Sequence, residues 1–303
     1  MTETNNGGIT LRKALGDYKT IHLAYRNYAT RTREEYLNDL EGLIRFLEKL
    51  GINHVKAISL PLIERYVAKL EQEGLTGRTR KRKVVSIRSF LAFLYQEGYI
   101  ETNIANKVIL PFTESRLPNV LTQTECDKLW NACAENPRDG AIIELLLQTG
   151  IKLSELIHLT LDDIRFDQKE KAGAHQKGLM RIKRSRAKKD GLIPLNNRAC
   201  IALKNYLNVR GNAENSALFL NRFDQPLGER GVERMLKKYL KKAKIGRVTT
   251  QTLRHTFGAY HMVHGTNLKT LQEVMGYKDM RSMDIYSSLV PVIKGNEMQD
   301  HSL

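Results

Sequence analysis

Apolar side chains in the first hundred residues recur every three or four positions, which is the spacing of an amphipathic helix. The clearest stripe covers residues 32–50 and ends at Gly51. Two further stripes fit helices over 60–70 and 77–95. The pattern therefore predicts an all-helical N-terminal domain over residues 10–106.

The periodic pattern weakens after this domain. Pro111 and Pro118 interrupt it, and both prolines disfavour a continuous helix. We therefore expect a linker over 107–120 and a second domain over 121–290. The stretch T-Q-T-E at its start is typical of a helix N-terminus, with Thr122 or Thr124 as the cap.

The second domain mixes helical stripes with one clear β signal. Residues 179–183 and 191–195 flank a turn rich in Arg and Lys, which favours a β-hairpin. Helices are expected at 138–149, 152–159, 197–209, 231–243, 250–264 and 267–275, and Tyr286 lies in a further segment. The predicted fold class is mainly α with a small β-hairpin or sheet, and residues 291–303 are expected to form a C-terminal tail.

Composition adds a preference for a polyanionic partner. Among 303 residues, Lys and Arg outnumber Asp and Glu by 49 to 33, which gives a net charge of +16. The three cysteines are an odd count without metal-ligand spacing, so core positions are favoured over a metal or redox role. No long apolar run and no signal peptide are evident. We expect a reduced, cytoplasmic, nucleic-acid-binding protein.

A basic cluster opens the helix predicted at 77–95. Its members are Arg78, Arg80, Lys81, Arg82 and Lys83, followed one turn later by Arg88. Such dense positive charge is self-repelling unless a polyanion neutralises it, which favours contact with DNA. A solvated helix end is the alternative.

The most informative chemistry lies between Thr250 and Tyr286. Arg254 opens a helical segment, and Tyr286 follows the Gly276-Tyr277 pair by nine residues. Arginine can clamp a phosphodiester with two parallel hydrogen bonds, and a tyrosine hydroxyl can attack phosphorus and hold it covalently. This spacing indicates a phosphoryl-transfer site.

Several segments in order resemble the tyrosine recombinases, or phage integrases, in particular their two-domain Xer-like members. The resemblance covers about residues 13–290. In the first domain it rests on TREEYLNDLEGLIRFLEKLG and GLTGRTRKRKVVSIRSFLAFLYQEGYIETNIA. In the second it rests on LLLQTGIKLSELIHLTLDDI, TLRHTFGAYHMVHG and LQEVMGYKDMRSMDIYSSL.

The resemblance implies a site-specific DNA recombinase, used in chromosome-dimer resolution, in DNA integration by a phage, or in the movement of a mobile element. Such enzymes cut and rejoin double-stranded DNA through a 3′-phosphotyrosyl intermediate and a Holliday junction, without a metal or cofactor. Four protomers act on two DNA sites, and inverted-repeat half-sites are expected. A helical core-binding domain and an α+β catalytic domain are expected to form a C-shaped clamp on the duplex.

The resemblance also assigns roles to individual residues. Tyr286 is the expected nucleophile, and Arg254 the arginine that binds the scissile phosphate. Lys152 stands where the family has its first arginine, and Gln251 where a histidine is usual. Tyr277 stands where His or Trp is usual and could donate its hydroxyl to a phosphate oxygen.

Other residues are expected to support these roles. Glu155 is expected to pair with Lys152 one helical turn away, or to form an exposed pair. His255 fits a buried hydrogen-bonding role or a catalytic one. The general acid of the family is a hairpin lysine. Here the count points to Arg186, whereas acid chemistry favours Lys183 or Lys188.

Two alternatives to an active recombinase stay open. Lys152 and Gln251 favour a DNA-binding accessory protein or a catalytically weakened relative. Lysine lacks the planar guanidinium that binds two phosphate oxygens at once, and glutamine cannot transfer a proton. The other alternative is a helix-turn-helix transcription factor, which would not need Tyr286.

The tail, which starts with Leu289, Val290, Val292 and Ile293, is expected to dock on a neighbouring protomer.

Overall fold

The computed structural model describes residues 8–26, 28–114, 117–167, 176–183, 190–210, 214–246 and 248–300. The chain divides into two compact units, Met1–Ser115 and Arg116–Leu303. Each unit has its own hydrophobic core.

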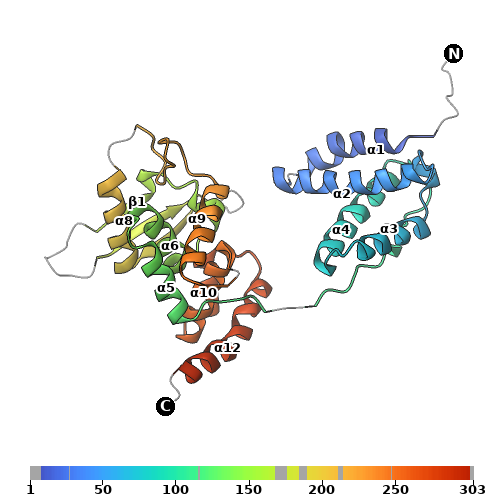
Figure 1. The fold of residues 1–303 in the computed structure, drawn as a ribbon. Coiled ribbons are helices and arrows are strands. Elements are labelled where there is room, and N and C mark those ends of the chain that lie inside the picture. The colour runs from blue at the N-terminus through green and yellow to red at the C-terminus, as the bar shows by residue number, and fades with distance from the viewer. Residues whose placement is uncertain are drawn as a thin grey trace. The chain divides into compact units, whose positions relative to one another are not determined.

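The secondary-structure elements described in the first unit are all helices (Figure 1). They are α1 (Leu11–Asp17), the π-helix η1 (Tyr18–Leu23), α2 (Thr30–Lys49), η2 (Val55–Ala57), α3 (Leu60–Gln72), α4 (Gly77–Gln96) and η3 (Ala105–Lys107). The apolar stripes of α2 and α4 face each other, and Leu43, Ile87 and Phe90 are fully buried there. The helices predicted from these stripes are confirmed.

The second unit contains eight helices of the described chain and a small sheet. The helices are α5 (Gln123–Cys133), α6 (Pro137–Thr149), α7 (Leu153–Leu156), α8 (Asn197–Arg210), α9 (Glu229–Lys242), α10 (Thr250–Val263), α11 (Leu268–Met275) and α12 (Asp284–Asp300). Short 3-10 turns, η4 (Leu161–Asp163) and η5 (Met280–Met283), precede β1 and α12.

Two details of these helices test the predictions from the sequence. Thr122 rather than Thr124 caps α5, in a capping box with Glu125. The helix expected at 152–159 is wrong in length, because α7 is a single turn.

The sheet has three antiparallel strands in the order β1-β2-β3. They are β1 (Ile164–Phe166), β2 (Gly178–Ile182) and β3 (Gly191–Leu195), with Met180 opposite Ile193. Alternate residues Met180, Ile182 and Ile193 are buried, so the predicted hairpin is confirmed. The sequence did not predict β1, because three residues are too few to display a two-residue period.

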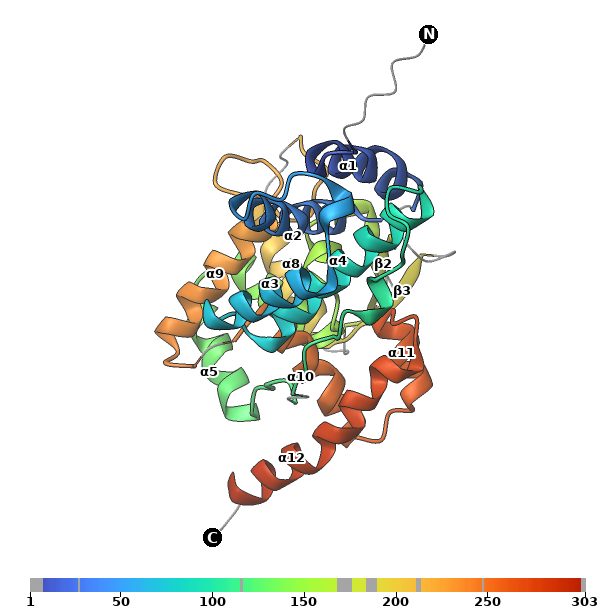
Figure 2. The same cartoon turned by 90° about the vertical axis from the view of Figure 1, so that its right-hand side faces the viewer.

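The expected tail does not begin at residue 291 as a separate element. Helix α12 continues through Pro291 to Asp300 (Figure 2). Leu289 and Ile293 are buried in a cluster of the same unit with Phe257 and Met283. Leu289 and Ile293 thus pack within their own unit, and the docking of the tail on a neighbouring protomer stays a prediction.

Cys126, Cys133 and Cys200 are buried in the second core. Burial raises the pKa of the Cys126 thiol to about 12 and that of Cys133 to about 11. Both thiols are therefore protonated at pH 7, which confirms their assignment to the core. Among the residues that the structure describes, no helix is long and apolar enough to cross a membrane.

Candidate active site

Helix α10 supplies the framework of the site. Thr249 caps it and forms a capping box with Thr252. Four positions follow the i, i+3, i+4, i+7 spacing of one helical face, and they are occupied by Gln251, Arg254, His255 and Gly258. Helix α10 packs against α6 and α12 (Figure 1). The face therefore meets the end of α6 and the first turns of α12.

The Arg254 side chain is almost completely buried, with 1% of its surface exposed. One terminal nitrogen, Nη1, donates to the carbonyl of Gly150, and Nη2 donates to the carbonyl of Met275 at 2.6 Å. The guanidinium carbon also lies 4.7 Å from the centre of the Tyr277 ring. Arg254 thus joins the C-terminal ends of α6 and α11.

Tyr286 projects from α12 into the same cluster and has 0% of its surface exposed. Its hydroxyl lies 3.0 Å from the Tyr277 hydroxyl and 3.2 Å from His255 Nδ1. Arg254 Nε lies 3.5 Å from the Tyr277 hydroxyl. The tertiary structure therefore brings Arg254, His255, Tyr277 and Tyr286 together, as their predicted roles require.

The ionisation of these groups follows from their burial and charge. Burial raises the pKa of Tyr286 far above its usual value, and its hydrogen bond with Tyr277 raises it further. Burial also favours a raised Tyr277 pKa, but the Arg254 charge and hydrogen bonds with Tyr286, Arg254 and Gln251 outweigh it and lower the pKa. Burial and the Arg254 charge lower the pKa of His255, so its ring is neutral at pH 7.

Gln251 lies at the margin of this cluster, and Lys152 is close in sequence to one of its carbonyl groups. The exposed Gln251 places Nε2 3.2 Å from His255 Nε2, on the far side of the ring from Tyr286. Lys152 follows Gly150, the carbonyl partner of Arg254, by two residues. Its ammonium lies 3.6 Å from Glu155, whose carboxylate also accepts the Lys152 backbone N–H at 2.9 Å. The predicted Lys152–Glu155 pair is confirmed.

The general-acid candidates are only partly described. Lys183 is exposed directly after β2, whereas Arg186 and Lys188 lie outside the described residues. The choice between Lys183, Arg186 and Lys188 therefore stays open.

Acidic side chains of neighbouring helices neutralise part of the basic cluster of α4. The buried Asp39 accepts two hydrogen bonds from Arg82, at 2.6 and 2.9 Å, and one from Lys83 at 2.9 Å. Arg80 pairs with Glu71 at 2.7 Å. The argument that these charges require a polyanion is therefore wrong for Arg80, Arg82 and Lys83. The sequence did not point to Asp39, because its partners lie more than forty positions away.

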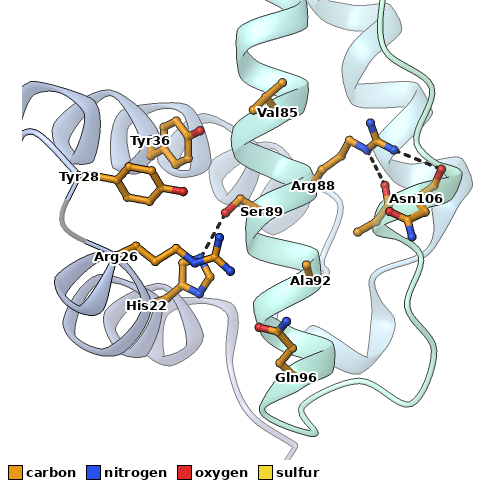
Figure 3. Close-up of a pocket in the computed structure, with 11 residues that line it drawn as sticks. His22, Arg26, Tyr28, Tyr36, Val85, Arg88, Ser89, Ala92, Gln96 and Asn106 are labelled. Atoms are coloured by element: carbon orange, nitrogen blue, oxygen red, sulfur yellow. Dashed lines mark hydrogen bonds between the residues drawn. The ribbon is translucent and has the colours of Figure 1, made fainter. Parts of the chain in front are cut away.

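The remaining basic residues of α4 differ in their surroundings. Arg78 and Lys81 are exposed. Arg88 instead points to the chain after α4, where its Nε donates to the carbonyl of Ala105 at 2.9 Å (Figure 3). It lines a cavity of about 360 Å³ together with Arg26. Arg78 and Lys81 are thus the members of the cluster best placed to meet an external anion.

Gly258 is a site residue that the sequence analysis missed. A Cβ atom built there would lie 2.3 Å from Cε1 of Tyr286, so the absence of a side chain lets the nucleophile candidate pack on α10. A glycine inside an otherwise regular helix is the signal that could have found it, because glycine is unfavourable there without a packing reason.

Gly258→Ala is expected to lower the free energy of unfolding by about 1–3 kcal/mol, because the new methyl group collides with the Tyr286 ring. Urea denaturation of the full chain measures this. Gly140→Ala in α6 is the matched control, since a Cβ there meets nothing closer than 3.8 Å. The control should be neutral or stabilising by up to ~1 kcal/mol. Equal responses of the two variants would contradict the packing role of Gly258.

Comparisons with known proteins place the chain in a family. Residues 119–290 match the model of the phage integrase family, and residues 18–98 match its N-terminal SAM-like domain. A tyrosine recombinase XerC of Oceanobacillus iheyensis is 31% identical over 274 residues, which cover 86% of this chain and 87% of that protein. A XerC of Thermodesulfovibrio yellowstonii is 32% identical over 272 residues, with 86% of each chain covered.

The fold also has solved counterparts. A lambda integrase dimer bound to a COC′ core site matches with a TM-score of 0.74 at 18% identity, over 92% of this chain and 77% of that one. The family models together span both units and include Arg254, Tyr277 and Tyr286. The chain therefore belongs to the phage integrase family and is a site-specific tyrosine recombinase.

Proposed function

We propose that this protein cuts and rejoins double-stranded DNA at specific sites, with Tyr286 as the nucleophile and Arg254 as the phosphate-binding residue. The observation that carries the proposal is the single cluster in which the Tyr286 hydroxyl lies 3.0 Å from Tyr277 and 3.2 Å from His255, beside the buried Arg254. It places a nucleophile, proton-accepting groups and a cation around one point.

In the cleavage step, Tyr286 Oη forms a bond to the scissile phosphorus and the bond from phosphorus to the 5′-oxygen breaks. The product is a 3′-phosphotyrosyl link and a free 5′-hydroxyl. Arg254 stabilises the extra negative charge of the five-coordinate transition state. The reverse attack by a 5′-hydroxyl of a partner strand restores the phosphodiester, so the bond energy is conserved without an external energy source.

Tyr286 and Arg254 are buried, which limits the access of a phosphate to the site. Tyr286 has 0% and Arg254 has 1% of its surface exposed, and the Arg254 donors are engaged by the carbonyls of Gly150 and Met275. These two bonds use only two of the five N–H donors of the guanidinium, but almost none of its surface is open to solvent, so a phosphate cannot reach it in this closed arrangement. DNA binding must therefore open the cluster before cleavage.

Lys152, Gln251 and a residue of the hairpin assist the two central residues in the reaction. Lys152 contributes positive charge to the phosphate and is held by Glu155. Gln251 can donate a hydrogen bond to a phosphate oxygen. The general acid that protonates the leaving 5′-oxygen is one of Lys183, Arg186 and Lys188. Lys183 is the described candidate, and its ammonium can release a proton, which arginine does poorly.

We extend the proposal to the domains and partners. Residues 10–106 form the core-binding domain, 107–120 the linker and 121–290 the catalytic domain. The net charge of +16 and the exposed Arg78 and Lys81 support DNA as the partner. A lambda integrase of similar fold is described as a tetramer bound to a Holliday junction, and we propose the same assembly here. The site of action is the DNA of the cytoplasm.

The decisive experiment uses a DNA substrate with a nick beside the cleavage site. Cleavage then releases a short fragment that diffuses away, so the covalent protein–DNA adduct accumulates and is seen by denaturing gel electrophoresis. Adduct formation by the wild-type protein supports the proposal. Specific DNA binding without any adduct would contradict it.

A catalytically weakened relative is the second candidate, because Lys152 and Gln251 depart from the family pattern. Lys152→Arg is expected to raise the rate of adduct formation about tenfold, since a guanidinium can bind two phosphate oxygens at once. The single-turnover rate on the nicked substrate measures this. Lys152→Gln, which removes the charge, is the control and should be slower than wild type. If Lys152→Arg is no faster, lysine does not limit this enzyme.

A further inference from the structure

Gln251 stands where the family usually has a histidine, and it cannot accept a proton at neutral pH. Yet Tyr286 must lose its proton as it attacks phosphorus. Two groups lie within hydrogen-bond distance of its hydroxyl, namely the Tyr277 hydroxyl at 3.0 Å and His255 Nδ1 at 3.2 Å. One of these two groups is positioned to take the proton.

The surroundings of the Tyr277 oxygen favour its anionic form. Arg254 Nε lies 3.5 Å from this oxygen, and the guanidinium carbon lies 4.7 Å from the ring centre. The Tyr286 hydroxyl lies 3.0 Å away, where it can donate its proton to this oxygen, and a hydrogen bond with Gln251 also lowers the Tyr277 pKa. Donors and a buried positive charge therefore converge on one phenol oxygen, which stabilises a phenolate.

Tyr286 has the opposite surroundings. Its ring lies in the apolar cluster with Met283 and Leu289, and burial raises its pKa. Arg254 and His255 from α10 and Tyr277 after α11 are the charged or titratable side chains that these contacts place around it. Two tyrosines that share a hydrogen bond but differ in environment have separated proton affinities. Such a separation assigns the acid and base roles of the pair.

We propose that Tyr277 is the proton acceptor that activates Tyr286 for attack on the phosphodiester. This inference rests on the proposed function, because it concerns the proton of the same nucleophile. In the step, the Tyr286 proton moves to the Tyr277 phenolate as Tyr286 Oη bonds to phosphorus. The electron pair of the broken bond leaves with the 5′-oxygen, which takes a proton from the general acid. Arg254 offsets the negative charge before and during the transfer.

His255 is the competing acceptor. Burial and Arg254 lower its pKa, which makes its ring a weaker base than a phenolate. Its Nε2 faces Gln251 Nε2 at 3.2 Å. When the Gln251 amide donates to this nitrogen, Nδ1 carries the proton and donates to Tyr286. In that tautomer His255 positions the Tyr286 oxygen and leaves the Tyr286 proton directed at Tyr277.

The test compares single-turnover rates of adduct formation on the nicked substrate as a function of pH. Tyr277→Phe keeps the ring on Arg254 and removes only the hydroxyl. It should slow adduct formation about 100-fold or more at pH 7.5, with DNA affinity unchanged. Its rate should continue to rise with pH where the wild-type rate has reached its plateau, because Tyr286 must then ionise without a base.

Two further variants separate proton transfer from packing. Tyr277→His can accept a proton and should recover at least about tenfold over Tyr277→Phe, with a plateau that begins at lower pH because the reference pKa of histidine is about 6.5. Tyr277→Trp can donate a hydrogen bond but cannot accept the proton, so it should stay as slow as Tyr277→Phe.

Several outcomes would overturn the inference. A Tyr277→Phe rate and pH profile equal to wild type would do so, as would recovery by Tyr277→Trp equal to that by Tyr277→His. A pH plateau lost in His255→Asn but kept in Tyr277→Phe would assign the proton to His255 instead. The proposed function fails separately, when Tyr286→Phe still forms the adduct or wild type forms none.

Discussion

Tyr286→Phe is expected to abolish the covalent protein–DNA adduct, with a loss of at least ~10⁴-fold in its rate of formation, because the oxygen that bonds to phosphorus is gone. DNA affinity should stay at the wild-type level, since the hydroxyl is completely buried and faces Tyr277 and His255. The measurement is adduct accumulation on the nicked substrate, beside a binding titration on the uncut duplex.

The folded state should tolerate this substitution. Phenylalanine keeps the ring that packs on Gly258 and loses two hydrogen bonds, which costs about 1–3 kcal/mol in the free energy of unfolding. Tyr260→Phe on α10 is the matched control, because it removes a hydroxyl from a tyrosine that packs against the same cluster. The control should form the adduct at nearly the wild-type rate. An undiminished adduct with Tyr286→Phe would remove Tyr286 from the nucleophile role.

Arg254→Ala is expected to slow adduct formation by at least ~10³-fold. Loss of one transition-state donor typically costs ~10²–10³ in rate, and Arg254 supplies two terminal donors and a charge. The same substitution should lower the free energy of unfolding by about 2–4 kcal/mol, because the buried carbonyls of Gly150 and Met275 lose their donors. Adduct rates and urea denaturation of the same preparation measure both effects.

Two variants divide the catalytic effect from the structural one. Arg254→Lys keeps the charge but cannot bind both carbonyls or both phosphate oxygens as a fork, so it should lose stability and rate to an intermediate degree. Arg234→Ala on the exposed side of α9 makes the same change in net charge and should alter neither. An Arg254→Ala protein that cleaves at the wild-type rate would contradict the phosphate-binding assignment.

Much of the fold could be predicted because its signals are local. The apolar stripes of α2 and α4 repeat within single helices, and the Thr122–Glu125 capping box lies within four residues. The hairpin of β2 and β3 has enough residues to show its alternation. Strand β1 was not predicted and the helix at α7 was predicted too long, because three or four residues carry too little periodicity. The acidic partners of Arg80, Arg82 and Lys83 were not predicted, because ion pairs between helices leave no local pattern in the sequence.

The sequence by itself determined which chemistry is available. The order and spacing of Lys152, Gln251, Arg254, Tyr277 and Tyr286 indicated the family, and helical periodicity placed Gln251, Arg254 and His255 on one face. The tertiary structure alone decided what those side chains touch. The contacts of Arg254 with Gly150 and Met275, and of Tyr286 with Tyr277 and His255, join segments from α6, α10, α11 and α12. Such contacts depend on how helices pack, and packing is a property of the whole core. It is this packing that buries the nucleophile and gives two nearby tyrosines different proton affinities.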